Sequence, residues 1–320
     1  MREESWTSAF APASIGNVAV GFDMLGLALE GVGDTVSVRR RSEEGVAVVA
    51  ALDPDGRPHS ELSVDPKKNT ASIAAAALWL AAAAPGGLEL VVRKGIPLQS
   101  GMGSSAASAA AAVVAANALL DSPFEIQKLL PYALEGEKFA SGGLHADNVA
   151  PSLLGGLVFC PAALLPNAVP LKAPPGLSSV LVHPDLKIDT AMARRSLSNT
   201  CTMEQWLTQQ GYLAMFMLAC ERDDHEMVAR SLRDVIIEPQ RAASVPPFHY
   251  VKDAALDAGA LGCSLSGSGP SIFALCENRH AAAVAEAMTK ACSGTGVDCR
   301  SWISSMNSPG AEVLARIDHG

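Results

Sequence analysis

A glycine-rich segment ahead of a predicted helix is the part of this sequence that points most directly to chemistry. Residues 94–107 have the sequence KGIPLQSGMGSSAA, in which Gly101 and Gly103 come just before a long alanine-rich run. Such a loop leaves backbone N–H groups unpaired at a helix N-terminus, where the helix dipole is positive, and both features attract phosphate oxygens. The adjacent hydroxyls of Ser104 and Ser105 support this interpretation, because a hydroxyl at the start of the helix can also ligate Mg²⁺. The segment therefore predicts a phosphate-binding loop.

Neither of two familiar nucleotide-binding loops matches this segment well. A Walker A loop needs its lysine directly before the hydroxyl, whereas Lys94 lies on the other side of the glycines. Gly101, Gly103 and Ala106 fit the dinucleotide fingerprint GxGxxA, but residues 96–99 separate them from the preceding strand. Lys94 can still supply positive charge near a phosphate. The alternative for Lys94 is a solvated lysine at a strand end.

Polar groups that could form a second binding site lie on both sides of this loop. Asn17 and Asp23 stand among small and apolar residues in APASIGNVAVGFDMLGLAL. Glu137, His145 and Asp147 occur in EKFASGGLHADNVAPS. Acid, imidazole and amide groups that converge beside glycines make a polar site, although single residues of these types more often form structural hydrogen bonds. For Asn17 and Asp23, a surface turn with Asx-type caps is the simpler alternative.

Mixed helices and strands are predicted to position these groups. Strands are predicted over residues 35–41, 45–52, 88–93, 155–160, 179–183, 271–276, 297–303 and 311–314. Helices are predicted over residues 69–84, 104–120, 124–139, 203–222, 224–232, 248–258 and 279–291. Prolines punctuate residues 161–176, which predicts a boundary between domains 1–160 and 161–320. The order of elements indicates an α+β sandwich architecture.

The composition excludes several classes of protein. The 320 residues are 49% hydrophobic and 18% charged, which is typical of a folded globule of two domains. The net charge of −9 removes the general attraction to phosphate backbones, so no nucleic-acid partner is expected. The longest apolar runs are alanine-rich and too short for a bilayer span, so no membrane partner is expected either. Glu3 and Glu4 stand where a signal peptide would be basic, and the seven cysteines include no CxxC pair, which together predict a cytoplasmic protein with reduced thiols.

Five motifs occur in an order and spacing that identify a family resemblance. They are APAS with GNVAVGFD, PLQSGMGSSAASA, HADNVAPS, EPQRA and SGSGPSIFAL. In this order the chain resembles the GHMP small-molecule kinases over nearly its whole length, and HADNVAPS and EPQRA point to the homoserine branch of that family. The first motif departs from the usual family pattern SANLGPGFD at Val18, Ala19 and Val20, while Asn17 and Asp23 keep their positions.

The resemblance implies a fold and an activity. The implied fold is a two-domain α+β GHMP kinase fold, with an N-terminal ribosomal-protein-S5-like domain and a C-terminal ferredoxin-like α/β sandwich. The implied activity is transfer of a phosphoryl group from ATP to the hydroxyl of L-homoserine on the route to threonine. Another GHMP kinase that acts on a different small alcohol is the nearest alternative; a non-catalytic nucleotide-binding module and a nicotinamide dehydrogenase are more distant ones. A homodimer is left open.

By the same resemblance, the ATP side of the site can be assigned. Asn69 in DPKKNTA would contact the adenine, Mg²⁺ would be held by Ser105 and Glu137, and Lys94 would add positive charge near the phosphates. These oxygen ligands suit a cation that retains several waters. The phosphates would be wrapped by Pro97, Leu98, Gln99, Ser100, Gly101, Met102, Gly103, Ser104, Ser105, Ala106 and Ala107.

The resemblance also assigns the substrate side. Asp23 and Asp147 are candidate partners for an ammonium group, and Arg194 and Arg241 can hold a carboxylate in bidentate geometry. Arg195, next to Arg194, leaves an ambiguity of one residue. Whether Asp147 acts as a base or only holds the ammonium stays open, because positioning and charge neutralisation dominate phosphoryl transfer. The substrate hydroxyl would be oriented by Asn17 and His145.

Overall fold

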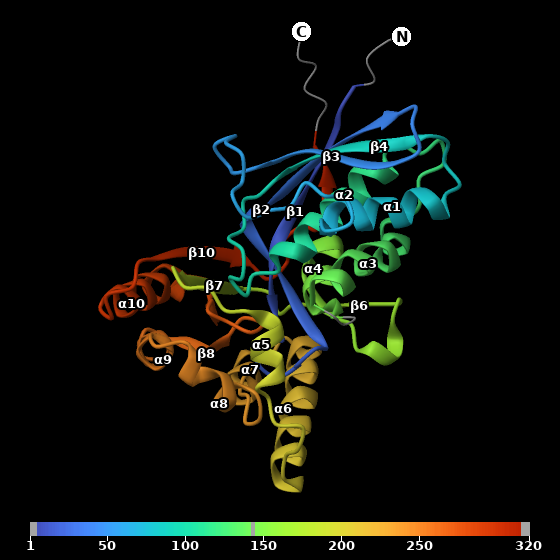
Figure 1. The fold of residues 1–320 in the computed structure, drawn as a ribbon. Coiled ribbons are helices and arrows are strands. Elements are labelled where there is room, and N and C mark those ends of the chain that lie inside the picture. Colours follow the sequence, from blue (N-terminus) through green and yellow to red (C-terminus); the bar gives the residue numbers. More distant parts are fainter. Residues whose placement is uncertain (1–4, 142–144, 315–320) are drawn as a thin grey trace.

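Two sheets organise the chain in the computed structural model, which describes residues 5–141 and 145–314 and so leaves Glu3 and Glu4 outside the description (Figure 1). The first sheet has the strand order β11-β1-β2-β4-β3, with β5 paired to β2 and β6 paired to β5. Its strands are β1 (Thr7–Gly16), β2 (Leu25–Arg41), β3 (Gly45–Leu52), β4 (Gly87–Arg93), β5 (Leu157–Phe159), β6 (Val169–Leu171) and β11 (Glu312–Val313).

Helices rich in small residues pack against this sheet. They are α1 (Thr70–Ala81), α2 (Ser104–Asn117), α3 (Leu130–Ser141) and α4 (Ala146–Leu154). Every described residue of α2 except Ser105 is buried. Alanine is the best helix former and its small side chain allows close packing, so α2 can sit among three helices and the sheet. The phosphate-loop segment is thereby attached to the most deeply buried helix of the first unit.

The second sheet has the antiparallel order β10-β7-β9-β8. Its strands are β7 (Leu177–Pro184), β8 (Ala260–Leu265), β9 (Ile272–Glu277) and β10 (Cys299–Ser305). Numbered within this unit, the order is 4-1-3-2 with helical crossovers after the first and third strands, which is the ferredoxin-like arrangement that the resemblance implied. Helices α9 (Phe248–Asp257) and α10 (Ala281–Ser293) cover one face of this sheet (Figure 1).

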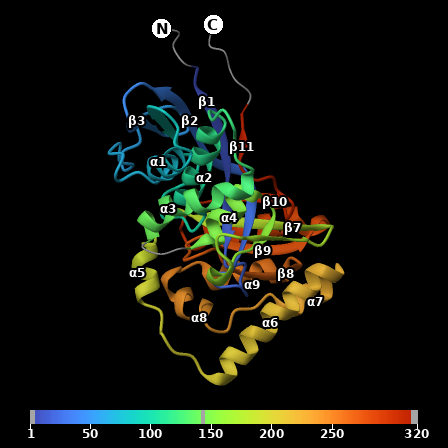
Figure 2. The ribbon, with the colours of Figure 1, turned by 90° about the vertical axis from the view of Figure 1, so that its right-hand side faces the viewer.

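The long connection from β7 to α9 forms the outer edge of the second unit. It contains α5 (Thr190–Arg195), α6 (Met203–Arg222), α7 (His225–Ser231) and α8 (Glu238–Arg241). Figure 2 shows α6 extending away from the body, with its first residues farthest out. None of the six described residues of α5 is buried.

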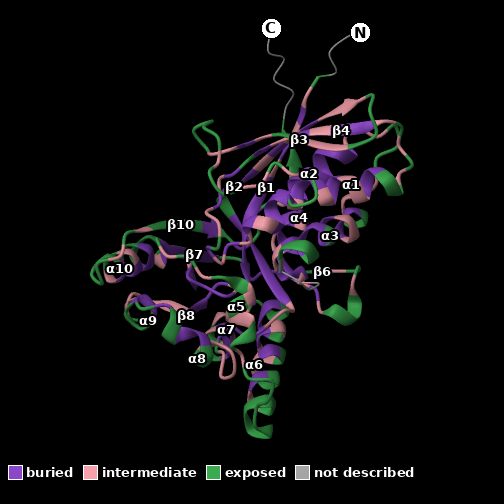
Figure 3. Ribbon diagram, viewed as in Figure 1, coloured by how far each residue is buried: buried purple, intermediate pink, exposed green. Residues whose placement is uncertain are grey.

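The two units share part of their hydrophobic core. One cluster fills the space around the first sheet and continues to Phe216 of α6 and to Phe273 of β9. A second cluster lies between the other face of the second sheet and the two covering helices, around Val182, Phe248 and Val284. Figure 3 shows the buried residues concentrated in the strands and in the helices that face them. The shared core shows that the two units pack directly against each other.

Most predicted elements are confirmed, and β3 and α6 have the predicted bounds. Strand β1 was not predicted, because its residues are mostly alanine, serine and proline. Its strand conformation depends on its burial in the sheet between neighbouring strands. Strand β2 begins at Leu25 instead of residue 35. Helix α4 was also missed, since it contains Pro151.

The sheet pairings cross the predicted domain boundary. Strand β6 pairs with β5, and β11 pairs with β1 through Ala9 opposite Val313, so two segments beyond residue 160 belong to the first sheet. The boundary at residue 160 stays a prediction. All seven cysteines lie in the described part of the chain and form no disulfide there. Among residues 5–141 and 145–314, no helix combines the length and the hydropathy needed to cross a membrane.

Candidate active site

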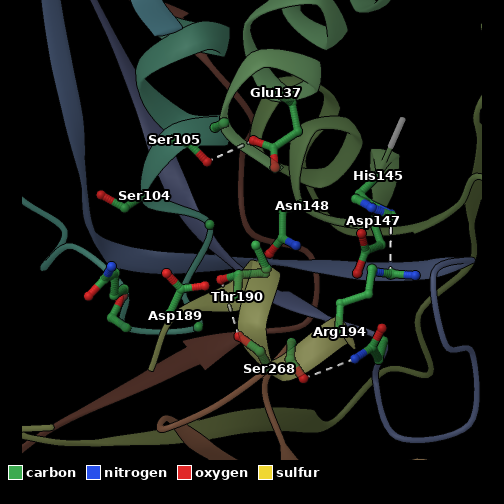
Figure 4. A pocket seen from close by; sticks show the side chains of 18 of the residues that line it. Ser104, Ser105, Glu137, His145, Asp147, Asn148, Asp189, Thr190, Arg194 and Ser268 are labelled. Atoms are coloured by element: carbon green, nitrogen blue, oxygen red, sulfur yellow. Dashed lines mark hydrogen bonds between the residues drawn. The ribbon is translucent and has the colours of Figure 1, made fainter. Parts of the chain in front are cut away.

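A pocket of about 330 Å³ lies between the two units (Figure 4). The first unit contributes the phosphate-loop segment, the loop between β1 and β2, and the facing ends of α3 and α4. The second unit contributes α5, Arg241 at the end of α8, and the turn at Gly267 and Ser268. Segments up to 250 residues apart in the sequence therefore meet here, as in the hydrogen bond from Asn17 to Gly267.

The phosphate-loop segment has three residues in the left-handed backbone region, two of which are glycines that favour it. Gln99, Gly101 and Gly103 all have positive φ values, at 56°, 74° and 69°. A Cβ atom on Gly101 would lie 2.5 Å from the carbonyl oxygen of Ser266, so only glycine fits there. Gly103 is the N-cap of α2, and no described side chain caps that helix. The first turn of α2 can therefore offer its N–H groups to an anion.

Neighbouring segments hold this loop through its carbonyl oxygens. Four successive carbonyls each accept a hydrogen bond: Gln99 from Ile188 N–H (3.2 Å), Ser100 from Ser271 N–H (3.2 Å), Gly101 from Ser266 Oγ (2.7 Å) and Met102 from Ser14 N–H (3.0 Å). These acceptors are thus occupied by protein donors. A loop fixed in this way is suited to present N–H groups rather than carbonyl oxygens to a phosphate.

Ser105 and Glu137 form a hydroxyl–carboxylate pair at the start of α2. Ser105 Oγ donates to Glu137 Oε2 at 2.7 Å, and Glu137 is 7% exposed (Figure 4). Two hard oxygen ligands beside a phosphate site fit Mg²⁺, which usually binds through one or two protein groups together with substrate phosphates and water. Within the part of the chain that the structure describes, no group of three or more His, Cys, Asp or Glu residues could hold a metal alone. The donor set therefore suits a cation that is shared with phosphates.

Charged side chains gather at the other end of the pocket. Arg194 Nη2 donates to both carboxylate oxygens of Asp23, at 2.5 and 2.6 Å. His145 Nδ1 lies 3.3 Å from Arg194 Nη2 and 3.6 Å from Asp23 Oδ1. Burial lowers the pKa of His145, against the opposing effect of Asp23, and the charges of Arg194 and Arg241 lower it further. Asn17 links the two units, since its Oδ1 accepts from the Asp23 N–H at 3.1 Å and its Nδ2 donates to Gly267.

Asp147 is a carboxylate kept largely out of water. It is 3% exposed and lines the pocket beside His145 (Figure 4). Burial, followed by the charges of Asp23 and Glu137, raises the pKa of Asp147 to about 7. A carboxyl group that titrates near neutral pH can take up a proton or hold a cation, and such groups are typical of functional sites.

Arg241 carries a buried N–H group without a partner. Its side chain is 6% exposed, Nη1 donates to Gly267 O at 2.8 Å, and Nε has no hydrogen-bond partner among the described residues. An unpaired buried donor is costly, and a charged one more so. Arg241 lines the pocket and therefore adds positive charge at this end. The guanidinium carbons of Arg194 and Arg241 also lie 5.1 and 5.2 Å from the ring centroid of Phe22.

The structure brings most of the predicted site residues together and leaves some out. Of the substrate candidates, all six line the pocket, and Arg194 rather than the exposed Arg195 does so. Of the loop residues, Leu98, Gln99, Ser100, Gly101, Gly103, Ser104 and Ser105 line it. Pro97, Met102, Ala106 and Ala107 are not among the described lining residues. The buried Met102, Ala106 and Ala107 instead anchor the loop in the core.

The prediction for Lys94 needs correction. Lys94 is 3% exposed and is not among the described residues that line the pocket. Its ammonium donates to the Asp34 carboxylate, to Ser104 O at 2.8 Å and to Ser108 Oγ at 2.9 Å. It is therefore neither a solvated lysine nor a free positive charge at the phosphates, because Asp34 neutralises it beneath the loop.

Asn69 also has a structural position. It is 1% exposed and is the N-cap of α1, where Oδ1 accepts from Ala71 N–H at 3.1 Å and Nδ2 donates to Ser63 O at 2.9 Å. It is not among the described lining residues. An amide whose donor and acceptor are both engaged in capping has little left for an adenine, so this geometry does not support the predicted contact.

Sequence reasoning missed several lining residues. Asp189 and Thr190 lie at the start of α5, and Thr190 Oγ1 lies 3.3 Å from Ser268 Oγ (Figure 4). Asn148 follows Asp147 and accepts from Ser14 Oγ at 3.0 Å. The sequence offered one indication: Asp189 and Thr190 lie in the same motif as Arg194, and Asn148 directly follows Asp147. Without the fold, nothing in the sequence distinguishes the side of a six-residue helix that faces a pocket.

Comparisons with known proteins agree with this geometry. Residues 69–156 match the family model for the GHMP kinases N terminal domain, and residues 216–294 match the model for GHMP kinases C terminal. A homoserine kinase of Xanthomonas campestris pv. campestris is 46% identical, over 96% of this chain and 94% of its own. A homoserine kinase of Chlorobaculum tepidum is 39% identical, over 96% of this chain and 98% of its own. The crystal structure of homoserine kinase from Cytophaga hutchinsonii has a TM-score of 0.92 and 38% identity, covering 98% of this chain and 99% of that chain.

A glycine-rich loop at a helix N-terminus, facing a cluster of charged side chains, is an arrangement that suits a small-molecule kinase. The chain belongs to the GHMP kinase family, and the predicted two-domain α+β fold is confirmed. Within that family, its similarity over almost the full length is to homoserine kinases.

Proposed function

We propose that this protein is a homoserine kinase, which transfers the γ-phosphoryl group of ATP to the hydroxyl of L-homoserine and releases ADP and O-phospho-L-homoserine. The observation that carries the proposal is one pocket with two unlike ends. At one end lies a loop that leads into the N-terminus of α2, and at the other lie two carboxylates and two guanidinium groups. Backbone N–H groups at a helix N-terminus suit the phosphates of a nucleotide. Neighbouring side chains of both charges suit a zwitterionic substrate.

The charged end is arranged for an amino acid. Asp23 and Arg194 pair with each other at 2.5 Å, so each would exchange its partner for one charge of the substrate. Asp23 and Asp147 would take the ammonium, and Arg194 and Arg241 the carboxylate. The charge of Arg241 supports this assignment, since its guanidinium lines the pocket beside Arg194 and a carboxylate would offset both positive charges.

The proposed mechanism relies on positioning and on charge. Asn17 and His145 would orient the substrate hydroxyl toward the loop, because both line the pocket beside Asp23, a proposed partner of the ammonium. Asp147, with a pKa of about 7, can receive the hydroxyl proton or hold the ammonium. Phosphoryl transfer needs little covalent help from the protein, so either role is sufficient.

The proposal includes Mg²⁺ and ATP as the cation and the phosphoryl donor. Ser105 and Glu137 would hold the cation, which when bound neutralises charge on the phosphates. Residues 97–107 would bind the phosphates through the loop and the first turn of α2. The proposal also includes a cytoplasmic location, because the reaction consumes ATP and a free amino acid; a homodimer stays a prediction.

A coupled assay of ADP release tests the proposal. Purified protein with MgATP is offered L-homoserine, an amino alcohol without a carboxylate, a hydroxy acid without an ammonium group, mevalonate, and no acceptor. We expect ADP release to depend on homoserine, with the two truncated compounds much poorer. A clear preference for another alcohol would replace the assignment with a different GHMP kinase, and ATP binding without any turnover would reduce it to a nucleotide-binding protein.

A further inference from the structure

Asp34 and Lys94 form a buried ion pair beneath the phosphate-binding loop, and the mechanism above gives this pair no role. Asp34 is 0% exposed and Lys94 is 3% exposed. One Asp34 oxygen accepts the N–H groups of Gly95, at 2.9 Å, and Ile96, at 3.2 Å. The other accepts the Lys94 ammonium and the Ser108 hydroxyl, the latter at 2.6 Å. Four donors on one buried carboxylate make a fully satisfied network, which is the condition under which buried charges are tolerated.

The same network holds both ends of the loop. Gly95 and Ile96 enter the loop, and Asp34 fixes their N–H groups. Ser104 and Ser108 leave it as part of α2; Lys94 Nζ donates to Ser104 O at 2.8 Å, and Ser104 Oγ donates to Ile96 O at 3.2 Å. We call Asp34, Lys94 and Ser108 the loop clasp. None of the three is among the described residues that line the pocket.

The charge balance of the loop clasp preserves the positive potential above it. A carboxylate alone near the start of α2 would offset the helix dipole and compete with phosphate. A lysine alone there would be repelled by the positive end of the helix dipole. Because the two charges cancel, the N-terminus of α2 keeps its partial positive charge for a ligand in the pocket.

We propose that the loop clasp positions the phosphate-binding loop for ATP. Between its ends the loop contains three residues with positive φ, among them Gln99 at 56°, a conformation that is unfavourable for residues with a side chain. Fixed ends hold the loop in this shape before ATP arrives, so less order has to be imposed during binding. The inference rests on the proposed function, because ATP is the ligand whose binding the clasp controls.

The test measures MgATP affinity by calorimetry without any acceptor, together with the melting temperature. Asp34→Asn combined with Lys94→Met removes both charges and leaves neither buried alone, so it should fold with little change in Tm. We expect its Kd for MgATP to rise about tenfold. The milder Ser108→Ala keeps the ion pair and removes one donor and one acceptor. Its Kd should rise by about threefold, and its Tm should fall slightly because Lys94 and Asp34 each lose a buried partner. In steady state, KM for ATP should rise more than KM for homoserine.

A partly exposed ion pair between β2 and β4, the strand that ends just before Lys94, serves as a control. Arg39 in β2 pairs with Glu89 in β4 at 2.7 Å, and Arg39→Met with Glu89→Gln should leave the MgATP affinity unchanged. Folded clasp variants with wild-type affinity would show that the pair is only a core feature, and the proposal would then be wrong. If the double variant does not fold, an unchanged Kd in Ser108→Ala overturns it alone. A wild-type protein that binds no MgATP would instead contradict the proposed function.

Discussion

The two ends of the pocket are built in different ways. The proposed phosphate end comes from one continuous segment, and its proposed binding groups are backbone N–H groups set by glycines and by the start of α2. The substrate end comes from four separate segments and uses charged side chains, among them Asp23, Asp147, Arg194 and Arg241. The groups of a backbone site can come from one stretch of sequence, although distant residues such as Ser14 and Ser271 hold that stretch in place. The groups of a side-chain site have to be brought together from several segments.

The ends also differ in how firmly they are held. Helix α2 is buried along its whole length apart from Ser105, while none of the six described residues of α5, which carries Arg194, is buried. Helix α5 is instead held by polar contacts such as Arg194 with Asp23 and Thr190 with Ser268. The phosphate end is therefore preset, and the substrate end is more easily rearranged when a ligand changes these contacts.

The strongest expected effect comes from the substrate end. Arg241→Leu would leave the homoserine carboxylate poorly paired in a nearly dry site. The free-energy barrier that corresponds to kcat/KM should rise by about 2 to 5 kcal/mol, while ATP binding stays nearly unchanged. Steady-state kinetics with homoserine and with an amino alcohol lacking the carboxylate would check this. The amino alcohol should be a poor substrate and lose little further activity. Equal losses for both compounds would mean that Arg241 serves the phosphates or the fold; Arg195→Leu is the exposed control.

Glu137→Gln tests the phosphate end through its cation. We expect kcat to fall by about 10- to 100-fold, because the variant loses the charge of a proposed ligand without opening a core cavity. The measurement is turnover as a function of Mg²⁺ concentration. Glu135→Gln, on the exposed side of the same helix, should behave like the wild type. Near wild-type turnover of Glu137→Gln at saturating Mg²⁺ would exclude Glu137 as a ligand.

Gly103→Val should weaken ATP binding by about 10-fold or more, because a β-branched residue resists the positive φ of this position at a cost of about 1 to 2 kcal/mol. The new Cβ would also lie 2.4 Å from Ser14 Oγ and 3.0 Å from Asn148 Oδ1. Titration of the folded variant with MgATP measures the change. At Gly296, φ is also positive, at 82°, and a Cβ there would have no described atom within 4 Å. Gly296→Val thus reports the backbone strain alone, and equal ATP affinities for the two variants would mean that the loop is only a connection.

The smallest effect is the pH dependence of Asp147. Since its pKa is about 7, kcat/KM for homoserine should rise with pH and level off above 7, as the carboxylate becomes available to the ammonium. The raised pKa has the opposite effect on stability. Between the ordinary value of 3.8 and about 7 the folded state binds a proton that the unfolded state lacks, so stability falls as pH rises through this range up to about 7. Asp147→Asn should remove both trends, and rate and Tm profiles from pH 5 to about 9 would show whether it does.

The sequence predicted the phosphate loop more completely than it predicted the surroundings. Glycines and serines ahead of an alanine-rich helix specify a backbone shape locally, and that is where the structure has it. Lys94 could not be placed, because its partner Asp34 lies 60 residues earlier on a neighbouring strand. The strand β1 and the position of Thr190 in the pocket could not be predicted either. Both depend on which segments become buried and on how the two units pack, and no local sequence pattern indicates them.

The return of the chain to the first sheet limits how the molecule can move. Strand β6 leaves the first sheet toward the second unit, and β11 comes back from it to pair with β1, so the second unit is an insertion attached by two covalent connections. A unit attached at one point can swing in any direction, whereas two connections leave rotation about a single axis through both. The shared core around Phe216 and Phe273 opposes even that rotation. The exposed helix α5, which carries Arg194, has no such core to hold it and is attached to the pocket by polar contacts.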